Sequence, residues 1–148
     1  MKDQLTPKQF ARLTGLLYLL VIICAGFSQG YVRGTIVAPG DAELTATNIL
    51  AQEGLFRLGF VTDLIAFVLD AVISVMLYKL FKPVNKNLAM VSSALRLLAH
   101  PAIASLNLLN HFMALEVLNG AEALSTFSLE QLQSAALLFM DAHRYGYL

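Results

Sequence analysis

The chain has 148 residues and no net charge, because ten Lys and Arg balance ten Asp and Glu. Charged residues make up 14% of it and apolar residues 57%, whereas about 25% of an ordinary soluble domain is charged. This composition excludes a disordered chain, which needs low hydrophobicity, and a nucleic-acid-binding protein, which needs a basic excess. The single cysteine, Cys24, excludes an intrachain disulfide framework. The composition therefore predicts an integral membrane protein.

The first predicted helix covers residues 7–32 and begins at a capping box whose N-cap is Thr6. Residues 13–32 are 20 consecutive uncharged positions, whereas the apolar region of a signal peptide has roughly 7–15. At about 1.5 Å per residue this run is about 30 Å long, which is one hydrocarbon thickness. Gly26 and Gly30 form a small-xxx-small step that would let another helix approach closely. We expect an uncleaved transmembrane helix.

Four more helices are predicted, and with the first they make an all-α membrane bundle with four transmembrane helices and one transmembrane domain over residues 1–148. The segment 42–52 mixes apolar and polar residues, which favours a short interfacial helix. In the third transmembrane helix, the interior Pro101 predicts a kink near His100. The last helix begins at a second capping box and has no stop signal, so the chain looks cut off inside it. The three long predicted helices that follow the interfacial one cover 55–80, 88–118 and 129–148.

The distribution of charge predicts the orientation. Six basic residues lie on one side of the expected membrane: Lys2, Lys8, Arg12, Lys79, Lys82 and Lys86. The other side has two basic residues, Arg33 and Arg57, and six acidic ones: Asp41, Glu43, Glu53, Glu116, Glu122 and Glu130. By the positive-inside rule the N-terminus faces the cytoplasm. We expect a multi-pass protein of the cell's inner (plasma) membrane.

Ionisable residues inside the predicted spans form the candidate site. Asp63 and Asp70 are seven residues apart, which places them on one face of their helix. On the cytoplasmic side, Asp70 lies eight residues from Tyr78 and Arg96 lies eight residues from Leu88. Both are about 12 Å deep, so we predict an ion pair between them. Asp141 and Arg144 lie nine and twelve residues from Leu132, so the last helix can offer Asp63 a partner. The predicted intramembrane polar cluster is Asp63, Asp70, Arg96, His100, Asn107, Asp141, His143 and Arg144, with Asn110 or His111 on the same stripe as Asn107.

No cofactor and no metal site is predicted. His100 and His111 share a helix face but lie about 16 Å apart along the axis, too far to share a metal ion. His143 is the remaining candidate ligand, and the chain has no HExxH motif and no Walker-type glycine loop. A membrane enzyme acting on lipids ranks last among the functions, because no convincing nucleophile or metal site lies near a headgroup level.

Two functional hypotheses stay open. In the first, the polar interior of the bundle moves protons or a small solute, with Asp63 and Asp70 as carriers. In the second, the buried polar groups only hold helices together, in a structural or interaction protein. Both hypotheses have the lipid bilayer as a partner, and neither involves nucleic acid. The structural hypothesis also predicts association of the protein with itself or with another membrane protein. A soluble helical domain is disfavoured by the uncharged runs of 20 and 19 residues.

Several strings of the sequence resemble a known family. They are PGDA at 39–42, TATNI at 45–49, EGLFRLG at 53–59, LYKL at 77–80 with KPVNKNLA at 82–89, and FSLEQLQ at 127–133 with LLFMDAH at 137–143. Together they resemble the bacterial multi-pass membrane proteins grouped as domain-of-unknown-function family 4386, over nearly the whole chain. The resemblance implies further membrane helices beyond Leu148, and hence a truncated fragment. It implies no catalytic or binding residues, because the family has no assigned activity.

Overall fold

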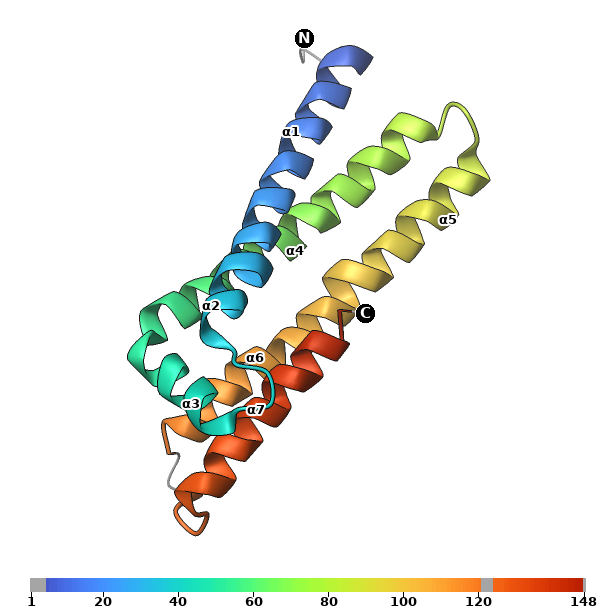
Figure 1. The fold of residues 1–148 in the computed structure, drawn as a ribbon. Helices are drawn as coiled ribbons and strands as arrows, with labels where there is room; N and C mark the ends of the chain where they lie inside the picture. The colour runs from blue at the N-terminus through green and yellow to red at the C-terminus, as the bar shows by residue number, and fades with distance from the viewer. Residues whose placement is uncertain (1–4, 121–123, 148) are drawn as a thin grey trace.

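The computed structural model describes residues 5–120 and 124–147, and every regular element within these ranges is helical (Figure 1). The first rod runs without a break through α1 (Pro7–Ala25), the π-helix η1 (Gly26–Arg33) and α2 (Gly34–Ile36). A short α3 (Ala42–Ala51) leads into the long α4 (Glu53–Phe81). The second rod consists of α5 (Lys86–Leu97), the π-helix η2 (Leu98–Ala104) and α6 (Ser105–Leu118), and α7 (Leu129–Tyr145) follows it.

The predicted all-α membrane bundle is confirmed. Within the described ranges, three helices are long and apolar enough to cross a membrane: Pro7–Ile36, Glu53–Phe81 and Lys86–Leu118. The shorter α7, with 17 residues, is not among them. Many of the large apolar side chains on α1 and α5 are exposed, as lipid-facing residues of a membrane helix are expected to be.

The helix ends follow the local sequence signals. Both predicted capping boxes are present, with the side chains of Thr6 and Ser128 accepting hydrogen bonds from the backbone three residues later. The side chain of Asp41 caps α3 in the same way. The first rod ends at Ile36 rather than at Val32, because the helix continues through η1. Lys2, Glu122 and Leu148, which the sequence analysis used, lie outside the described residues.

The helices gather most densely at the end of the bundle that carries α3. There η1, α2, α3, α4, α6 and α7 meet around one apolar core, which comprises Val32, Ile36, Ile49, Phe56, Ala114, Leu115, Ala136 and Met140. The predicted interfacial helix α3 is tied to the first rod, because Asn48 Nδ2 donates to the carbonyl oxygen of Ile36 at 3.1 Å. Towards the other end, α1, α4 and α5 continue beyond the end of α7 (Figure 1).

The first rod packs closely against α4 at Gly59. A Cβ atom there would lie 2.9 Å from Cγ1 of Val32, and the Ser28 hydroxyl donates to the Gly59 carbonyl oxygen at 2.9 Å. The expectation for Gly26 and Gly30 was wrong within the described chain, since a Cβ at either position would have no contact within 4 Å. The glycine that lets the first rod and α4 approach closely therefore belongs to α4.

Candidate functional site

Arg33 lies at the centre of a buried polar cluster. Its Nη2 donates to Asp63 Oδ2 at 2.6 Å, and its Nη1 donates to the Ser28 hydroxyl at 2.7 Å. The Arg33 and Asp63 side chains are 9% and 1% exposed. The pair therefore joins η1 to α4 inside the protein, where charge-assisted hydrogen bonds are strong and an unpaired charge is costly.

The prediction that Asp141 and Arg144 lie within reach of Asp63 was wrong, although Tyr147 of the same predicted segment lies 3.4 Å from the Asp63 carboxylate. Asp141 and Arg144 pair with each other instead, with Arg144 Nη2 3.0 Å from Asp141 Oδ1. They are three residues apart on α7, and side chains with this spacing are neighbours on one helix face. Arg33 was assigned to the membrane boundary, but the helix continues past it and its side chain turns inwards to take the Asp63 carboxylate.

His111 extends the cluster to α6. Its Nε2 lies 2.9 Å from the carbonyl oxygen of Phe56, which can only accept, so Nε2 carries the proton. Its Nδ1 then accepts from Arg33 Nη2 at 3.0 Å. The Phe56 ring stacks on the imidazole at a centroid distance of 3.8 Å. Of the two alternatives that the sequence left open, His111 is the residue that faces this cluster, while Asn110 donates to Asn107 Oδ1 at 3.0 Å.

Asn107 and His143 clamp α6 to α7. Asn107 Nδ2 donates to the backbone oxygen of His143 at 2.7 Å, and His143 Nδ1 donates to the backbone oxygen of Asn107 at 3.0 Å. The His143 ring meets the rings of His111 and Tyr147 edge-on, at centroid distances of 5.7 and 5.0 Å. Gly146 makes the clamp possible, because a Cβ there would lie 2.4 Å from the Asn107 amide. We call Arg33, Asp63, Asn107, His111, His143 and Tyr147 the Arg33 cluster.

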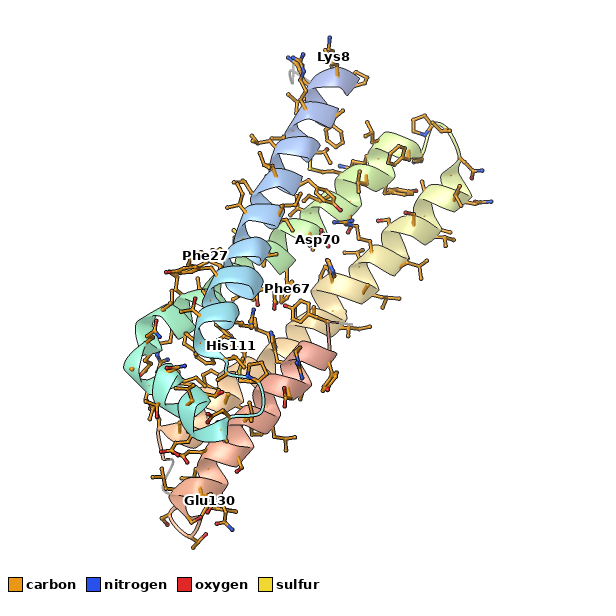
Figure 2. The ribbon with its side chains drawn as sticks, in the orientation of Figure 1. Lys8, Phe27, Phe67, Asp70, His111 and Glu130 are labelled. Carbon is orange, nitrogen blue, oxygen red and sulfur yellow. The ribbon has the colours of Figure 1, made fainter. Side chains whose placement is uncertain are left out.

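A second cluster contains the predicted ion pair between Asp70 and Arg96, which the structure confirms. Arg96 Nη1 also lies 3.1 Å from the Tyr18 hydroxyl, and its guanidinium carbon is 4.7 Å from the Tyr18 ring centroid. His100 Nδ1 lies 3.2 Å from Asp70 Oδ2. These four residues, the Arg96 cluster, connect α1, α4, α5 and η2. Asp70 and His111 lie at different heights of the bundle, so the two clusters are separate (Figure 2).

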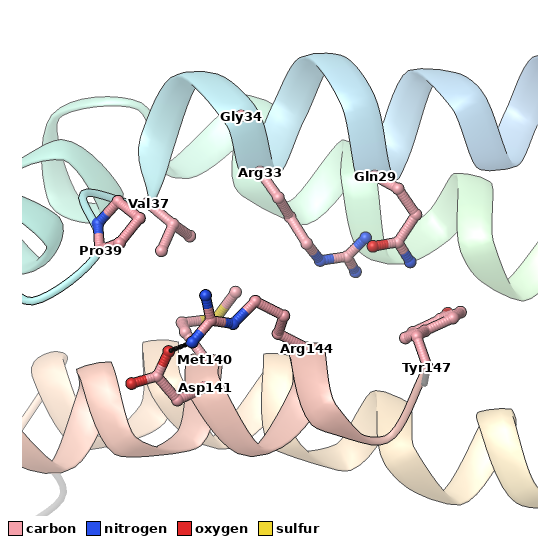
Figure 3. Close-up of a pocket in the computed structure, with 9 residues that line it drawn as sticks. All are labelled: Gln29, Arg33, Gly34, Val37, Pro39, Met140, Asp141, Arg144 and Tyr147. Carbon is pink, nitrogen blue, oxygen red and sulfur yellow. Dashed lines mark hydrogen bonds and ion pairs between the residues drawn. The ribbon is translucent and has the colours of Figure 1, made fainter.

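A cavity of about 560 Å³ opens between the first rod and α7 (Figure 3). Its volume falls within the roughly 300–1,000 Å³ of small-molecule sites. Gln29 and Arg33 point into it from η1, and Asp141, Arg144 and Tyr147 face them from the α7 side. Gln29 Nε2 and the Tyr147 hydroxyl each lie 3.4 Å from Asp63 Oδ2, which links the cavity wall to the buried carboxylate. Two members of the Arg33 cluster, Arg33 and Tyr147, thus lie on the cavity wall.

Three polar atoms of the Arg33 cluster have no hydrogen-bond partner among the described residues: Arg33 Nε, Asp63 Oδ1 and His143 Nε2. Buried polar groups are usually paired, so these enclosed atoms indicate places where a buried water can bind. Of the three residues, Arg33 also lines the cavity. Within the same ranges, no three His, Cys, Asp or Glu side chains are grouped as a metal ion would require. The chemistry that the site offers is hydrogen bonding and ion pairing.

Sequence reasoning missed Arg33, Gln29, Tyr147 and Tyr18. Gln29 and Arg33 are four residues apart and so lie on one helix face, a signal that was available. Tyr18 is 11 residues from Pro7, and Asp70 is 11 residues from Phe81. The comparison of depths that paired Asp70 with Arg96 therefore also places Tyr18 at the same depth. Tyr147 lies just past the end of α7 and offered no comparable pattern.

Residues 13–148 match the model of a family described as Domain of unknown function (DUF4386). The chain belongs to this family. Comparisons with curated proteins and with solved structures gave no match. Membership agrees with the resemblance seen in the sequence and with a membrane protein, and the description assigns no activity. The function therefore has to be argued from the geometry of the two clusters and the cavity.

Proposed function

We propose that this membrane protein binds a small polar solute or protons in the cavity beside the Arg33 cluster and moves them through the bundle. The observation that carries the proposal is the position of the Arg33–Asp63 pair. The pair is buried, Arg33 lines the cavity with Asp63 directly behind it, and each of the two side chains keeps one polar atom without a hydrogen bond among the described residues. A pair that only held helices together would gain nothing from a cavity beside it.

The same proposal includes a placement in the membrane. The whole chain forms one transmembrane domain of the inner (plasma) membrane, with the N-terminus and the turn between α4 and α5 in the cytoplasm. Lys79, Lys82 and Lys86 at that turn support this orientation. Asp63 lies 10 residues from Glu53 and 18 from Phe81, so the cavity belongs to the half of the membrane away from the cytoplasm.

A structural function is the second candidate, and the Arg96 cluster favours it. No residue of that cluster lines the cavity between the first rod and α7. Its contacts instead connect Tyr18, Asp70 and Arg96 from three different helices. If both clusters only hold helices together, the protein would act by associating with itself or with another membrane protein. It would then bind no solute and conduct no protons.

Flux through liposomes separates the two candidates. The purified protein is reconstituted with a pH-sensitive dye or a labelled solute inside the vesicles, and Asp63→Asn is compared with Asp70→Asn. We expect Asp63→Asn to lower the flux at least about tenfold, which corresponds to about 1.4 kcal/mol in the barrier. Asp70→Asn should leave the flux per folded protein within about twofold. Glu53→Gln is the matched control, because it removes an exposed carboxylate from the same helix.

Tyr147→Phe provides a second variant if Asp63→Asn does not fold. It removes the hydroxyl that lies 3.4 Å from Asp63 Oδ2 and keeps the ring. A reduced flux in this variant supports the proposal. Wild-type flux no greater than that of protein-free vesicles would refute it, as would wild-type flux in a folded Asp63→Asn protein.

A further inference from the structure

We infer that the cavity between η1 and α7 binds a zwitterionic amino acid with an apolar side chain. This inference rests on the proposed function and names the class of solute. It follows from three properties of the cavity: its balanced charge, the positions of its free donors and acceptors, and its apolar wall.

The charges at the cavity cancel. Arg33 and Arg144 are the cations on its wall, Asp141 is a carboxylate on the wall, and Asp63 lies directly behind Arg33. A ligand with a net charge would leave one charge without compensation inside a membrane protein, which is costly. A ligand whose own charges cancel avoids this cost. The charge balance therefore favours a neutral or zwitterionic ligand over an anion or a cation.

The free donors suit a carboxylate. Arg33 lies on the cavity wall, and its side chain extends into the cavity (Figure 3). Arg144 faces it from α7 and uses Nη2 to bind Asp141. A ligand carboxylate between the two helices would accept from both guanidinium groups, in the charge-assisted hydrogen bonds that arginine makes best.

The acceptor for an ammonium lies on α7. The Asp141 side chain is 33% exposed and binds Arg144 through Oδ1, so Oδ2 faces no partner from that pair. Because Asp141 and Arg144 are 3.0 Å apart, they present a carboxylate and a guanidinium side by side. The head of an amino acid carries the same two charges in complementary positions. It can bind Arg144 with its carboxylate and Asp141 with its ammonium group.

The remaining wall is apolar. Val37, Pro39 and Met140 line the end of the cavity away from Gln29 and Tyr147 (Figure 3). A sugar or other polyol would bury hydroxyl groups against this wall without hydrogen-bond partners, which is unfavourable. An aliphatic side chain would instead remove apolar surface from water. This asymmetry selects an amino acid with an apolar side chain over a neutral polyol.

The test uses L-leucine and two analogues that each lack one charge. 4-Methylpentanoate has no ammonium group, and 3-methylbutylamine has no carboxylate. Binding of radiolabelled leucine to the purified protein in detergent is measured by equilibrium dialysis, with each analogue as competitor. We expect leucine to bind and each analogue to compete at least about tenfold more weakly.

Arg144→Gln and Asp141→Asn should each weaken leucine binding at least about tenfold. Arg57→Gln is the matched control, because Arg57 and Glu53 also form an exposed pair within one helix, 2.7 Å apart, away from this cavity. Undetectable binding of leucine to the wild type would overturn the inference. So would equal competition by an analogue, or an equal loss of affinity in Arg57→Gln.

Failure of the leucine inference can be distinguished from failure of the transport proposal. If leucine does not bind but proton flux depends on Asp63, the solute class is wrong and the polar pathway stands. If leucine binds as expected but wild-type vesicles show neither proton nor leucine flux, the binding site stands and the transport proposal is wrong.

Discussion

The Arg96 cluster provides a quantitative test of how a membrane protein tolerates a buried ion pair. The two partners differ in exposure: the Asp70 side chain is 1% exposed and that of Arg96 is 25% exposed. The charge left behind by a mutation therefore depends on which partner is removed. We expect the two single substitutions to have unequal effects on the free energy of unfolding.

Arg96→Leu leaves the Asp70 carboxylate buried, with the exposed His100 as its remaining polar neighbour in the cluster. Removal of one partner from a buried pair typically costs about 3–5 kcal/mol, and we expect this value here. Asp70→Asn leaves an arginine that reaches the protein surface and keeps its contacts with Tyr18. Because a long side chain can move its charge towards the headgroups, we expect a smaller loss of about 1–2 kcal/mol.

The double variant carries neither isolated charge, so its loss should be smaller than the sum of the two single losses by about 1–3 kcal/mol. Reversible unfolding in mixed detergent micelles, followed by circular dichroism, measures all four free energies. The exposed Glu53–Arg57 pair is the control, and its coupling should stay below about 1 kcal/mol. A cost of Asp70→Asn equal to that of Arg96→Leu, or additivity within about 0.5 kcal/mol, would refute the reasoning.

Two glycines give further predictions for the same assay. Gly59→Ala should cost about 1–3 kcal/mol, since its Cβ would lie 2.9 Å from a valine side chain of η1, whereas Gly30→Ala should be neutral or stabilise by up to about 1 kcal/mol. Equal effects of the two would contradict the close approach at Gly59. Gly146→Ala should cost about 1–3 kcal/mol by displacing the Asn107 amide from its place between α6 and α7. The double variant with Asn107→Ala should then lose less free energy of unfolding than the sum of the two single losses. Additive losses would contradict the predicted contact between the new Cβ and the Asn107 amide.

The Asp70–Arg96 pair could be predicted because its two helices share one turn. α4 ends at Phe81 and α5 begins at Lys86, so residue counts on both sides start from almost the same depth. The spans, the capping boxes and the Asp41 cap were predictable for a similar reason. Each depends on residues that are close together in the sequence, and no assumption about packing is needed.

The Arg33–Asp63 pair could not be predicted in the same way. Between the first rod and α4 the chain makes a loop and the separate helix α3, so depths in the two rods have no common origin. The charge on Arg33 also suggested the end of a span. The helix in fact continues to Ile36. Asp63 and Ser28 accept hydrogen bonds from the Arg33 guanidinium, which lipid chains could not do.

The inward face of α7 was misjudged because charge was given more weight than periodicity. Ala136, Met140 and His143 are buried, and their spacing of four and three residues is that of one helix face. Asp141 and Arg144 lie one position further along and face the cavity. Small and apolar residues at helical spacing were the better guide to packing, and the charged residues mark the open side of the helix.

The order of the charged residues along the chain has a consequence for biogenesis. Arg33 precedes Asp63 by 30 residues, and Arg96 follows Asp70 by 26. At about 5–20 residues per second, the ribosome takes roughly 2–6 s to make the stretch between Arg33 and its partner. During this interval the arginine has no carboxylate to neutralise it in the bilayer. We therefore expect the first rod and α4 to enter the membrane together as a pair. The second rod would neutralise Asp70 of α4 only after it has emerged.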